Sequence, residues 1–453
     1  EKLPSSRELS KTLGISRNTV VNCYEQLNAE GYIETRFGSG SFVAENAIQQ
    51  PFLDDSKHCK REPVLTDIAK KSLIHWRRYD LNKDLGSDVE INFQYGPVNI
   101  SDELLTDINR ISRKCGETIN SNYQTPEGLQ RLRESIARYT QQSRGCRCRP
   151  ENIIITNGAQ QALDLIARML ITENEEVLIE DPAYRGATQA FANLGAKLIP
   201  STVDENGINP NNFSDQDAES VRLIYTTPSH QFPTGGVLSL PRRLSLLEWA
   251  NKHNAFIIED DNDSEFRYQG PPIESIQGLD EYDQTIYIGT FSKILSPVMR
   301  VGYVILPDSL VDAFTALKWC ADRHSPLFNQ LILAEFMDSP LFAKHLKRSR
   351  KVYSKRHDVL INALDKHFGD DVTVQGTNAG IHLLAWMNKI DASREAELFE
   401  HADSMSLGLY TPTSLYIKPP SKLGLLMGYG NLNCDKIETG VERLAECYAK
   451  LKI

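Results

Sequence analysis

Apolar positions at the start of the chain follow the spacing of two short helices and a hairpin. Ser5 and Glu8 are spaced as a capping box, which predicts that a helix begins there and ends at Gly14. Ser16 is suited to cap a second helix, whose apolar stripe recurs every three to four residues and which ends at Gly31. Residues 32–43, with glycines at the turn, predict a hairpin. The pattern therefore predicts a helix-turn-helix followed by a β-hairpin wing, and we expect a preceding helix that completes such a domain to lie outside the printed sequence.

From residue 91 onward, short β-branched runs alternate with helical spacing. This alternation is typical of a mostly parallel sheet with helices on both faces, so the predicted fold class is α/β. Residues 45–88 mix both charge signs, with one possible helix around 65–76, and we interpret them as a linker. The predicted organisation is a head (residues 1–44), the linker (residues 45–88) and a body (residues 89–453). The strands predicted in the body lie at 152–156, 176–180, 222–226, 255–260 and 285–288.

Composition narrows the class of protein further. The chain has 453 residues and is 40% hydrophobic, which suits a globular protein with folding units of ~150 residues. No apolar run approaches the ~18 residues of a membrane-spanning helix, and no positive-then-apolar leader opens the chain, so we expect a cytoplasmic protein with no membrane partner. The 8 cysteines are scattered, which indicates reduced thiols. Cys146 and Cys148 lie close together without a second ligand pair at zinc spacing, so we expect no metal site.

Charge is distributed unevenly along the chain. The formal net charge is -10, from 50 basic and 60 acidic residues, so overall charge does not indicate a nucleic-acid binder. A small neutral head thus precedes a large acidic remainder. The head balances Lys2, Arg7, Lys11, Arg17 and Arg36 against Glu1, Glu8, Glu25, Glu30 and Glu34.

The first turn of the second predicted helix carries polar side chains where a recognition helix places its base and phosphate contacts. Arg17 can form two hydrogen bonds to guanine, and Asn18 can bond adenine or phosphate. Arg7 is placed to grip the DNA backbone, and Arg36 lets the wing approach the minor groove. A lone arginine is more often a solvated surface charge, which is the alternative for Arg17 and Arg36. The candidate DNA contacts are Arg7, Arg17, Asn18, Thr19, Arg36 and Gly38.

Lys293 follows the predicted strand at 285–288 together with the companions that a Schiff-base lysine needs. The hydroxyls of Thr290 and Ser292 and the guanidinium of Arg300 can hold a phosphate beside it. Asp260 ends another strand, where a parallel sheet places its ligand crevice, and a carboxylate there can keep a pyridinium nitrogen protonated. Because a lone lysine is usually a solvated charge, the interpretation depends on these companions.

Two further strand ends fit the same chemistry. Ala159 and Gln160 open a long helix after an Asn-Gly turn, so their free N–H groups can bind an anion. Tyr184 follows Asp-Pro-Ala at the end of another strand and offers a ring to stack on a flat cofactor. Each motif alone is weak, since many such turns contain Asn-Gly. All four in this order favour a pyridoxal phosphate site.

Residues 3–44 resemble the winged helix-turn-helix of the GntR family of bacterial transcription regulators. The family motif Pro-Ser-x-Arg-Glu-Leu is matched at 4–9, and Ser-Arg-x-Thr-Val is matched at 16–20. The resemblance implies a bacterial protein whose partner is operator DNA, contacted through Arg7, Arg17, Asn18, Thr19 and the wing.

Residues 91–453 resemble the class I aminotransferase fold, fold type I of the pyridoxal phosphate enzymes, with a smaller C-terminal α+β subdomain. Behind a GntR head, with the runs TPSHQFPTG at 227–235 and EDDNDSEF at 259–266, the chain is identified as a member of the MocR-type group. The resemblance implies that Lys293 carries the cofactor as an aldimine, that Asp260 pairs with the pyridine nitrogen and that Tyr184 stacks on the ring. Tyr123 matches a tyrosine that reaches the partner subunit's phosphate, so a head-to-tail homodimer is expected. The phosphate ligands implied are Ala159, Gln160, Thr290, Ser292 and Arg300.

One departure concerns the cofactor's O3' oxygen. The MocR-type group usually has tyrosine where this chain has Asn262, and aminotransferases use an asparagine where this chain has Phe232. The amide of Asn262 or of Gln231 is a substitute donor. A weaker bond to the oxygen would shift the pKa of the lysine-bound cofactor.

A second departure is an absence. Aminotransferases bind the substrate carboxylate with an arginine of the C-terminal domain, but residues 395–442 contain none. Lys418 and Lys422 are cations in this stretch, and a flexible ammonium is a poorer fork for a carboxylate than a guanidinium. The departures favour an effector that is pyridoxal phosphate itself or an amine without an ordinary α-carboxylate.

Three hypotheses of function follow from these residues. The first is a transcription regulator that senses pyridoxal phosphate or an amine through Lys293. The second is an aminotransferase with an accessory DNA-binding head. The third is an α/β protein that keeps the body for dimerisation alone, which the retention of Lys293, Asp260 and Arg300 disfavours. His382 is as consistent with packing as with function.

Overall fold

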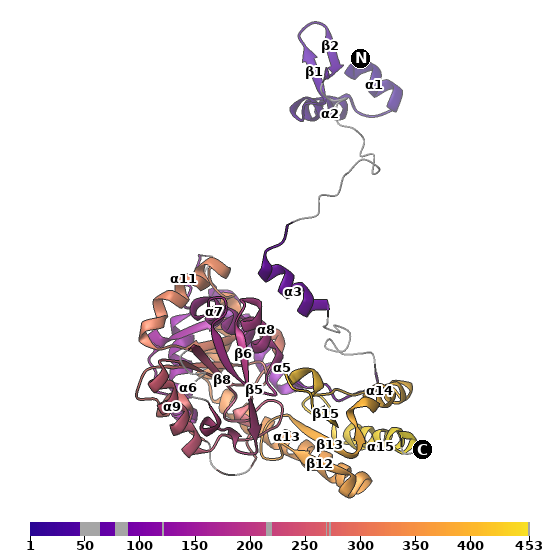
Figure 1. The fold of residues 1–453 in the computed structure, drawn as a ribbon. Helices are drawn as coiled ribbons and strands as arrows, with labels where there is room; N and C mark the ends of the chain where they lie inside the picture. Colours follow the sequence, from indigo (N-terminus) through magenta and orange to yellow (C-terminus); the bar gives the residue numbers. More distant parts are fainter. Residues whose placement is uncertain are drawn as a thin grey trace. The chain divides into compact units, whose positions relative to one another are not determined.

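A computed structural model of the protein describes residues 1–45, 64–77, 89–119, 122–213, 220–268, 270 and 273–451. The chain divides into two compact units, a first unit of Glu1–Leu65 and a second of Thr66–Ile453 (Figure 1). Of the predicted linker, residues 46–63 and 78–88 lie outside the described residues. No helix of the described chain is long and apolar enough to cross a membrane.

The first unit contains the predicted helix-turn-helix and wing. Ser5 accepts a hydrogen bond from the N–H of Glu8, whose carboxylate accepts one from the N–H of Ser5, which confirms the capping box. Ser16 caps the second helix by accepting from Thr19 N–H, as predicted. Gly14 ends the first helix with a φ of 65°, a conformation that suits glycine. The elements are α1 (Ser6–Leu13), α2 (Arg17–Ala29), β1 (Ile33–Arg36) and β2 (Gly40–Val43).

Few side chains form the interior of this unit. Val20 from α2 and Ile33 from β1 are buried together with Ala44 after the wing. The backbone N–H of Thr35 donates to Asn28 Oδ1 at 3.2 Å, which ties the wing to α2. Several large apolar side chains of this unit are left exposed, among them Leu13, Ile15, Tyr32 and Phe37.

The centre of the second unit is an eight-stranded sheet in the order β4-β11-β10-β9-β8-β5-β6-β7. The strands from β10 to β6 run parallel in that order, whereas β11 and β7 are antiparallel to their neighbours. The central strands are buried on both faces. This burial explains why their sequences are near-continuous runs of β-branched and apolar residues. The strands are β4 (Ile153–Thr156), β5 (Glu176–Asp181), β6 (Lys197–Asp204), β7 (Gly207–Ile208), β8 (Val221–Thr226), β9 (Phe256–Asp261), β10 (Thr285–Thr290) and β11 (Gly302–Ile305).

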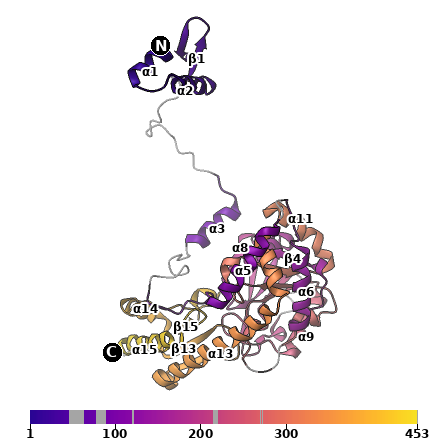
Figure 2. The ribbon, with the colours of Figure 1, turned by 180° about the vertical axis from the view of Figure 1, so that it is seen from behind.

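Helices cover both faces of this sheet, as the α/β prediction requires (Figures 1 and 2). One apolar core includes α7 (Ala159–Leu170), α8 (Arg185–Asn193) and α11 (Val311–Asp322). A second core, on the opposite face, includes α5 (Asp102–Thr118), α6 (Gln130–Arg144) and α12 (Leu327–Met337). Two further helices, α9 (Leu240–His253) and α10 (Ile276–Leu279), pack beside β8 and β9.

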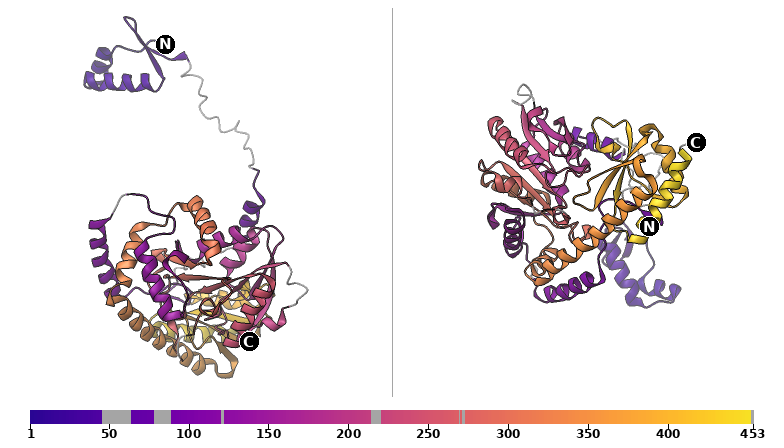
Figure 3. Two further views of the ribbon diagram at one scale, coloured as in Figure 1. Left: turned by 90° about the vertical axis from the view of Figure 1, so that its left-hand side faces the viewer. Right: turned by 90° about the horizontal axis from the view of Figure 1, so that it is seen from below.

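A smaller C-terminal α+β subdomain adjoins the large sheet (Figure 3). Its antiparallel sheet has the order β12-β13-β15, and its core includes residues of the long helix α13. Because α13 also contributes Phe342 to the core around α6, one helix joins both parts. The elements are α13 (Pro340–Phe368), β12 (Val372–Gln375), β13 (His382–Asp391), α14 (Glu395–Ser404), β15 (Lys422–Gly428) and α15 (Cys434–Leu451), with β3 (Ile91–Asn92) paired to β14 (Leu407–Gly408).

One helix of the predicted linker is described, α3 (Asp67–Arg77), close to the predicted position 65–76. It belongs to the second unit and lies against α8 (Figure 1).

Candidate cofactor site and DNA-binding face

A cavity of about 1060 Å³ opens at the carboxyl ends of the parallel strands. This is the edge where an open α/β sheet places its ligands. The turns after β4, β5, β9 and β10 each bring predicted residues to its wall. The predicted residues in the wall are Ala159, Gln160, Tyr184, Asp260, Asn262, Thr290, Ser292, Lys293 and Arg300.

Lys293 lies just beyond the end of β10, with its amine inside the cavity. Its Nζ donates a hydrogen bond to the carbonyl of Gly96 at 3.0 Å. A Cβ on Gly96 would lie 3.1 Å from this Nζ, so a glycine allows the backbone to approach. Burial lowers the pKa of Lys293 to about 8, and the carboxylate of Asp263 opposes this effect. A larger share of the amine is therefore unprotonated and nucleophilic at neutral pH than for an exposed lysine.

Asp260 is buried at the end of β9 and accepts a hydrogen bond from Tyr225 Oη at 2.7 Å. The parallel pairing of β8 with β9 brings the tyrosine alongside. Burial raises the pKa of Asp260 to about 7, against the lowering effect of the Tyr225 hydroxyl. A positively charged group beside this carboxylate would favour its ionised form. A protonated pyridine nitrogen is such a group.

Further residues that line the cavity could hold an anion. Gly158 has a φ of 88° directly before α7, and a Cβ there would lie 3.2 Å from Arg300 Nη2. Arg300 Nη2 donates to the carbonyl of Asn157 at 2.6 Å, which holds the guanidinium beside the start of α7. Thr290 Oγ1 donates to Ser292 Oγ at 2.9 Å. Free N–H groups, hydroxyls and a guanidinium thus line one cavity, and groups of these kinds can hold a phosphate.

Aromatic rings also line the cavity. The Phe232 ring centroid lies 4.9 Å from that of Tyr95 and 6.1 Å from that of Tyr184. All three residues line the cavity. A flat heteroaromatic ring fits a space bordered in this way, so the residues present fit pyridoxal phosphate in charge, shape and polarity.

The predicted DNA-binding residues lie on the surface of the first unit. Arg17 is at the first position of α2, where its Nε is 3.5 Å from Ser6 Oγ. Arg36 lies over the Phe42 ring, 5.2 Å from the centroid, and forms an exposed ion pair with Glu34. The structure thus leaves both helix and wing side chains available to a nucleic acid. The exposed candidates are Arg7, Arg17, Asn18, Thr19, Arg36 and Gly38.

Comparison with known proteins matches both parts of the chain. Residues 1–43 match the bacterial regulatory proteins of the gntR family, and residues 108–445 match aminotransferase class I and II. The chain is 32% identical to a Rhizobium meliloti protein described as probable rhizopine catabolism regulatory protein MocR, over 100% of this chain and 90% of that protein. This chain is a MocR-type regulator of the GntR family.

Two other relatives bear on the body of the MocR-type regulator. The pyridoxine biosynthesis transcriptional regulator PdxR of Corynebacterium glutamicum is 29% identical over 86% of this chain and 79% of that protein. The solved structure of LysN, an α-aminoadipate aminotransferase from Thermus thermophilus, holds a phosphopyridoxyl-leucine compound. It is 27% identical, with a TM-score of 0.76, over 86% of this chain and 98% of that chain. The cofactor of this MocR-type regulator is pyridoxal phosphate, and the protein is a transcription regulator related to that cofactor.

The structure separates the two candidate amide donors of this regulator. Gln231 Nε2 donates to Glu180 Oε2 at 3.1 Å and to the carbonyl of Pro182 at 2.8 Å, and Gln231 does not line the cavity. Asn262 does line it. Of the two amides, Asn262 is therefore the one placed to reach a bound cofactor.

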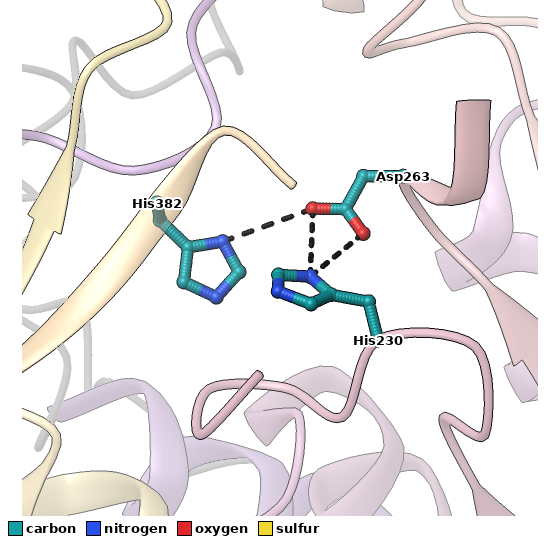
Figure 4. A group of neighbouring side chains, drawn as sticks. All are labelled: His230, Asp263 and His382. Carbon is teal, nitrogen blue, oxygen red and sulfur yellow. Dashed lines mark hydrogen bonds and ion pairs between the residues drawn. The ribbon is translucent and has the colours of Figure 1, made fainter. Parts of the chain in front are cut away.

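A buried cluster of His230, Asp263 and His382 joins the large sheet to β13 (Figure 4). His230 Nδ1 donates to both carboxylate oxygens of Asp263, at 3.0 and 3.2 Å. His382 Nδ1 lies 3.8 Å from the same carboxylate, and burial lowers the pKa of His382 to about 3, so its ring is neutral at neutral pH. Their candidate ligand atoms lie within 4.8 Å of one another, although the sequence analysis expected no metal site. His382, which the sequence left undecided, packs against the Phe232 ring of the cavity wall.

Other lining residues were missed from sequence. Arg185 and Glu395 place a cation and an anion at the cavity, whereas Lys418 and Lys422 are exposed and absent from its lining. Arg185 directly follows the predicted Tyr184, so its position next to a strand end was a usable signal. His75 and Trp76 come from the linker and gave no signal, because their helix reaches the cavity only through tertiary packing.

Tyr123 stands apart from the other predicted residues. It is 78% exposed and does not line the cavity of its own chain. Its ring lies 6.0 Å from that of His324, and the Arg323 guanidinium lies 5.3 Å from its centroid. An exposed aromatic residue held by neighbours in this way suits contact with another subunit.

Proposed function

We propose that this regulator binds operator DNA through its head and senses pyridoxal phosphate or an amine ligand at Lys293. The observation that carries the proposal is the joint presence, in one chain, of an exposed helix-turn-helix and a cavity lined by Lys293, Asp260 and Arg300. Operator DNA is chromosomal, so the protein works in the bacterial cytoplasm. A ligand changes DNA binding only if it binds better to one arrangement of the protein than to another.

Each part of the cofactor has a place in the cavity. Arg300, Thr290, Ser292 and the N–H groups of Ala159 and Gln160 hold the phosphate in this proposal. Asp260 pairs with the pyridine nitrogen, and Asn262 reaches the O3' oxygen. Tyr184 stacks on the ring. Bound pyridoxal phosphate supplies an aldehyde that reacts with primary amines and a ring that accepts electrons.

The chain's own residues prepare this chemistry. The lowered pKa of Lys293 keeps part of its amine unprotonated, and Gly96 orients that amine through its carbonyl. Tyr225 fixes the Asp260 carboxylate toward the cavity. Phe232 and Tyr95 exclude water from the ring face. The site is thus arranged to capture the cofactor and to exchange its amine.

The proposal includes a head-to-tail homodimer. Tyr123 supports it, because it is exposed in its own chain and would serve the partner's phosphate. Two heads would then read two half-sites of one operator, as symmetric dimers do. DNA contacts are assigned to Arg7, Arg17, Asn18, Thr19, Arg36 and Gly38.

The test uses full-length protein stripped of cofactor, mixed with DNA from upstream of its own gene. We expect pyridoxal phosphate, alone or with an amine, to change the DNA affinity of the native chain but not of Lys293→Ala. Fluorescence anisotropy of labelled DNA measures both. An equal change in the two proteins, or none in the native chain under either condition, contradicts the proposal.

An aminotransferase with an accessory head is the second candidate. Arg185 favours this candidate, because it lines the cavity and a guanidinium can bind the carboxylate of an amino-acid substrate. Repeated conversion of an amino acid and a keto acid, lost in Lys293→Ala, would establish it. Single-turnover exchange without repeated conversion would favour the sensor.

A further inference from the structure

The helix α3 presents one face to the second unit. Lys71, Ser72 and His75 are half-buried on that face, whereas Leu73 and Ile74 are exposed. The spacing of three and four residues places the half-buried side chains on one side of a helix. This helix is part of the segment that joins the head to the body.

Two polar contacts attach α3 to the body. His75 Nδ1 donates to Asn193 Oδ1, at the end of α8, at 2.9 Å. Lys71 Nζ lies 3.9 Å from Glu173 Oε1. The first contact holds the helix against the far end of α8, and the second joins it to the turn between α7 and β5.

The same end of α8 belongs to the cofactor cavity. Arg185, Gln189 and Asn193 line it at successive turns of α8. At ~1.5 Å of rise per residue, Asn193 lies ~12 Å along the helix from Arg185, which adjoins the aromatic wall. The cavity therefore extends along α8, from the proposed cofactor position at Tyr184 to α3.

Residues of α3 close this outer end. Ser72, His75 and Trp76 line the cavity there, and Glu395 and Phe399 of α14 also belong to its lining. The cavity volume of about 1060 Å³ is at the upper end of the ~300–1,000 Å³ usual for ligand sites, so space remains beside a cofactor. The lining from α3 and the end of α8 combines an aromatic ring with hydroxyl, imidazole and amide groups.

We propose that the outer half of the cavity is a ligand subsite with α3 as one wall. It takes the far end of a primary amine whose amino group lies at Lys293 and whose other end carries a hydrogen-bonding group. The inference rests on the proposed function, since it assumes amine capture at Lys293. It identifies Ser72, His75 and Trp76 as specificity-determining residues, and it places the ligand in contact with the segment that leads to the head.

Two amino alcohols of different length test the subsite in cofactor-loaded, full-length protein. Ethanolamine is short and occupies little beyond the Lys293 end, whereas aminohexanol extends its hydroxyl farther along the cavity. The change in visible cofactor absorbance gives an apparent dissociation constant for each. We expect His75→Ala to weaken aminohexanol binding about fivefold, the effect of one lost hydrogen bond, and to leave ethanolamine unchanged. Trp76→Ala has the same expected selectivity.

Two controls separate a subsite from a general disturbance. Trp319 is 51% exposed, similar to Trp76 at 56%, but does not line the cavity, so Trp319→Ala should change neither constant. His75→Gln keeps a hydrogen-bond donor and should recover part of the aminohexanol affinity. Because both amines are measured on the same protein, a variant that folds poorly would affect both.

The outcomes distinguish this inference from the proposed function. The subsite alone is overturned if His75→Ala and Trp76→Ala both leave the ratio of the aminohexanol and ethanolamine dissociation constants unchanged while ethanolamine still reacts. A cofactor band that responds to neither amine in the native protein overturns amine sensing at Lys293, and the subsite with it.

Discussion

Arg7, Arg17 and Arg36 extend from the surface of the head, whereas Lys293 and Asp260 lie inside a cavity of the body. The head needs no altered pKa, because phosphates and base edges are bound by ordinary cations and amides. The body shifts the pKa of Lys293 to about 8 and that of Asp260 to about 7 through burial. A surface site works by presenting side chains to DNA, while an enclosed site works by changing their chemistry.

Removal of the lysine is the most severe way to break this comparison. Lys293→Ala should abolish the visible absorbance of lysine-bound cofactor completely, because among the described residues that line the cavity Lys293 is the only lysine. The affinity of cofactor-free protein for DNA should stay the same, since the head is intact. Retention of a lysine-type absorbance band in the variant would contradict the assignment.

Arg17→Ala tests the other side of the comparison. A lost base contact costs ~1–3 kcal/mol, so DNA affinity should fall ~5- to 150-fold while cofactor absorbance stays unchanged. Fluorescence anisotropy with operator and unrelated DNA measures the loss and its sequence dependence. Arg110→Ala, an exposed arginine of α5, is the matched control and should leave affinity intact. If Arg17→Ala and Arg110→Ala had the same DNA affinity, Arg17 would be a solvated surface charge and not a DNA contact.

The pH dependence of cofactor capture sharpens the role of burial. With a pKa of about 8, the unprotonated fraction of Lys293 rises ~10-fold from pH 7 to pH 9 and then levels off. The sign follows because only the unprotonated amine attacks the aldehyde. Stopped-flow absorbance at low cofactor concentration gives the rate. A rate that climbs without a plateau toward the ordinary lysine pKa of 10.5 would show that burial does not alter this amine.

The smallest predicted effect concerns the stability of the head. Ser5→Ala removes both the hydroxyl that caps α1 and its part in the capping box, which should destabilise that helix by ~1 kcal/mol. Hydrogen exchange of α1 amides should rise, while exchange in the body stays constant. Ser10→Ala, within α1, serves as the control. Equal exchange in the two variants would mean that the cap is not needed.

The two regions also differed in how much the sequence revealed. The helix boundaries of the head follow from Ser5, Gly14 and Ser16, which act within one turn of the chain, and the structure confirms them. Body strands and the cavity position of Lys293 were also predictable, because parallel strands bring their carboxyl ends to one edge.

The rest of the cavity depended on contacts between distant segments. His75 meets Asn193 across 118 positions, and Tyr225 meets Asp260 across neighbouring strands. Neither pair has a local pattern, so the sequence left α3 as part of a linker. Arg185 is different, because it directly follows Tyr184 after β5, and a strand end of this kind is a local pattern.

Reciprocal linkage tests the central claim, that the cavity of the body controls DNA binding by the head. If bound pyridoxal phosphate changes DNA affinity by some factor, DNA must change cofactor affinity by the same factor. We would titrate full-length, cofactor-stripped protein with pyridoxal phosphate, with and without saturating operator DNA, and follow absorbance. The account predicts two dissociation constants that differ by the factor measured from the DNA side. Identical constants with and without operator DNA would contradict it, because the cavity would then have no control over DNA binding.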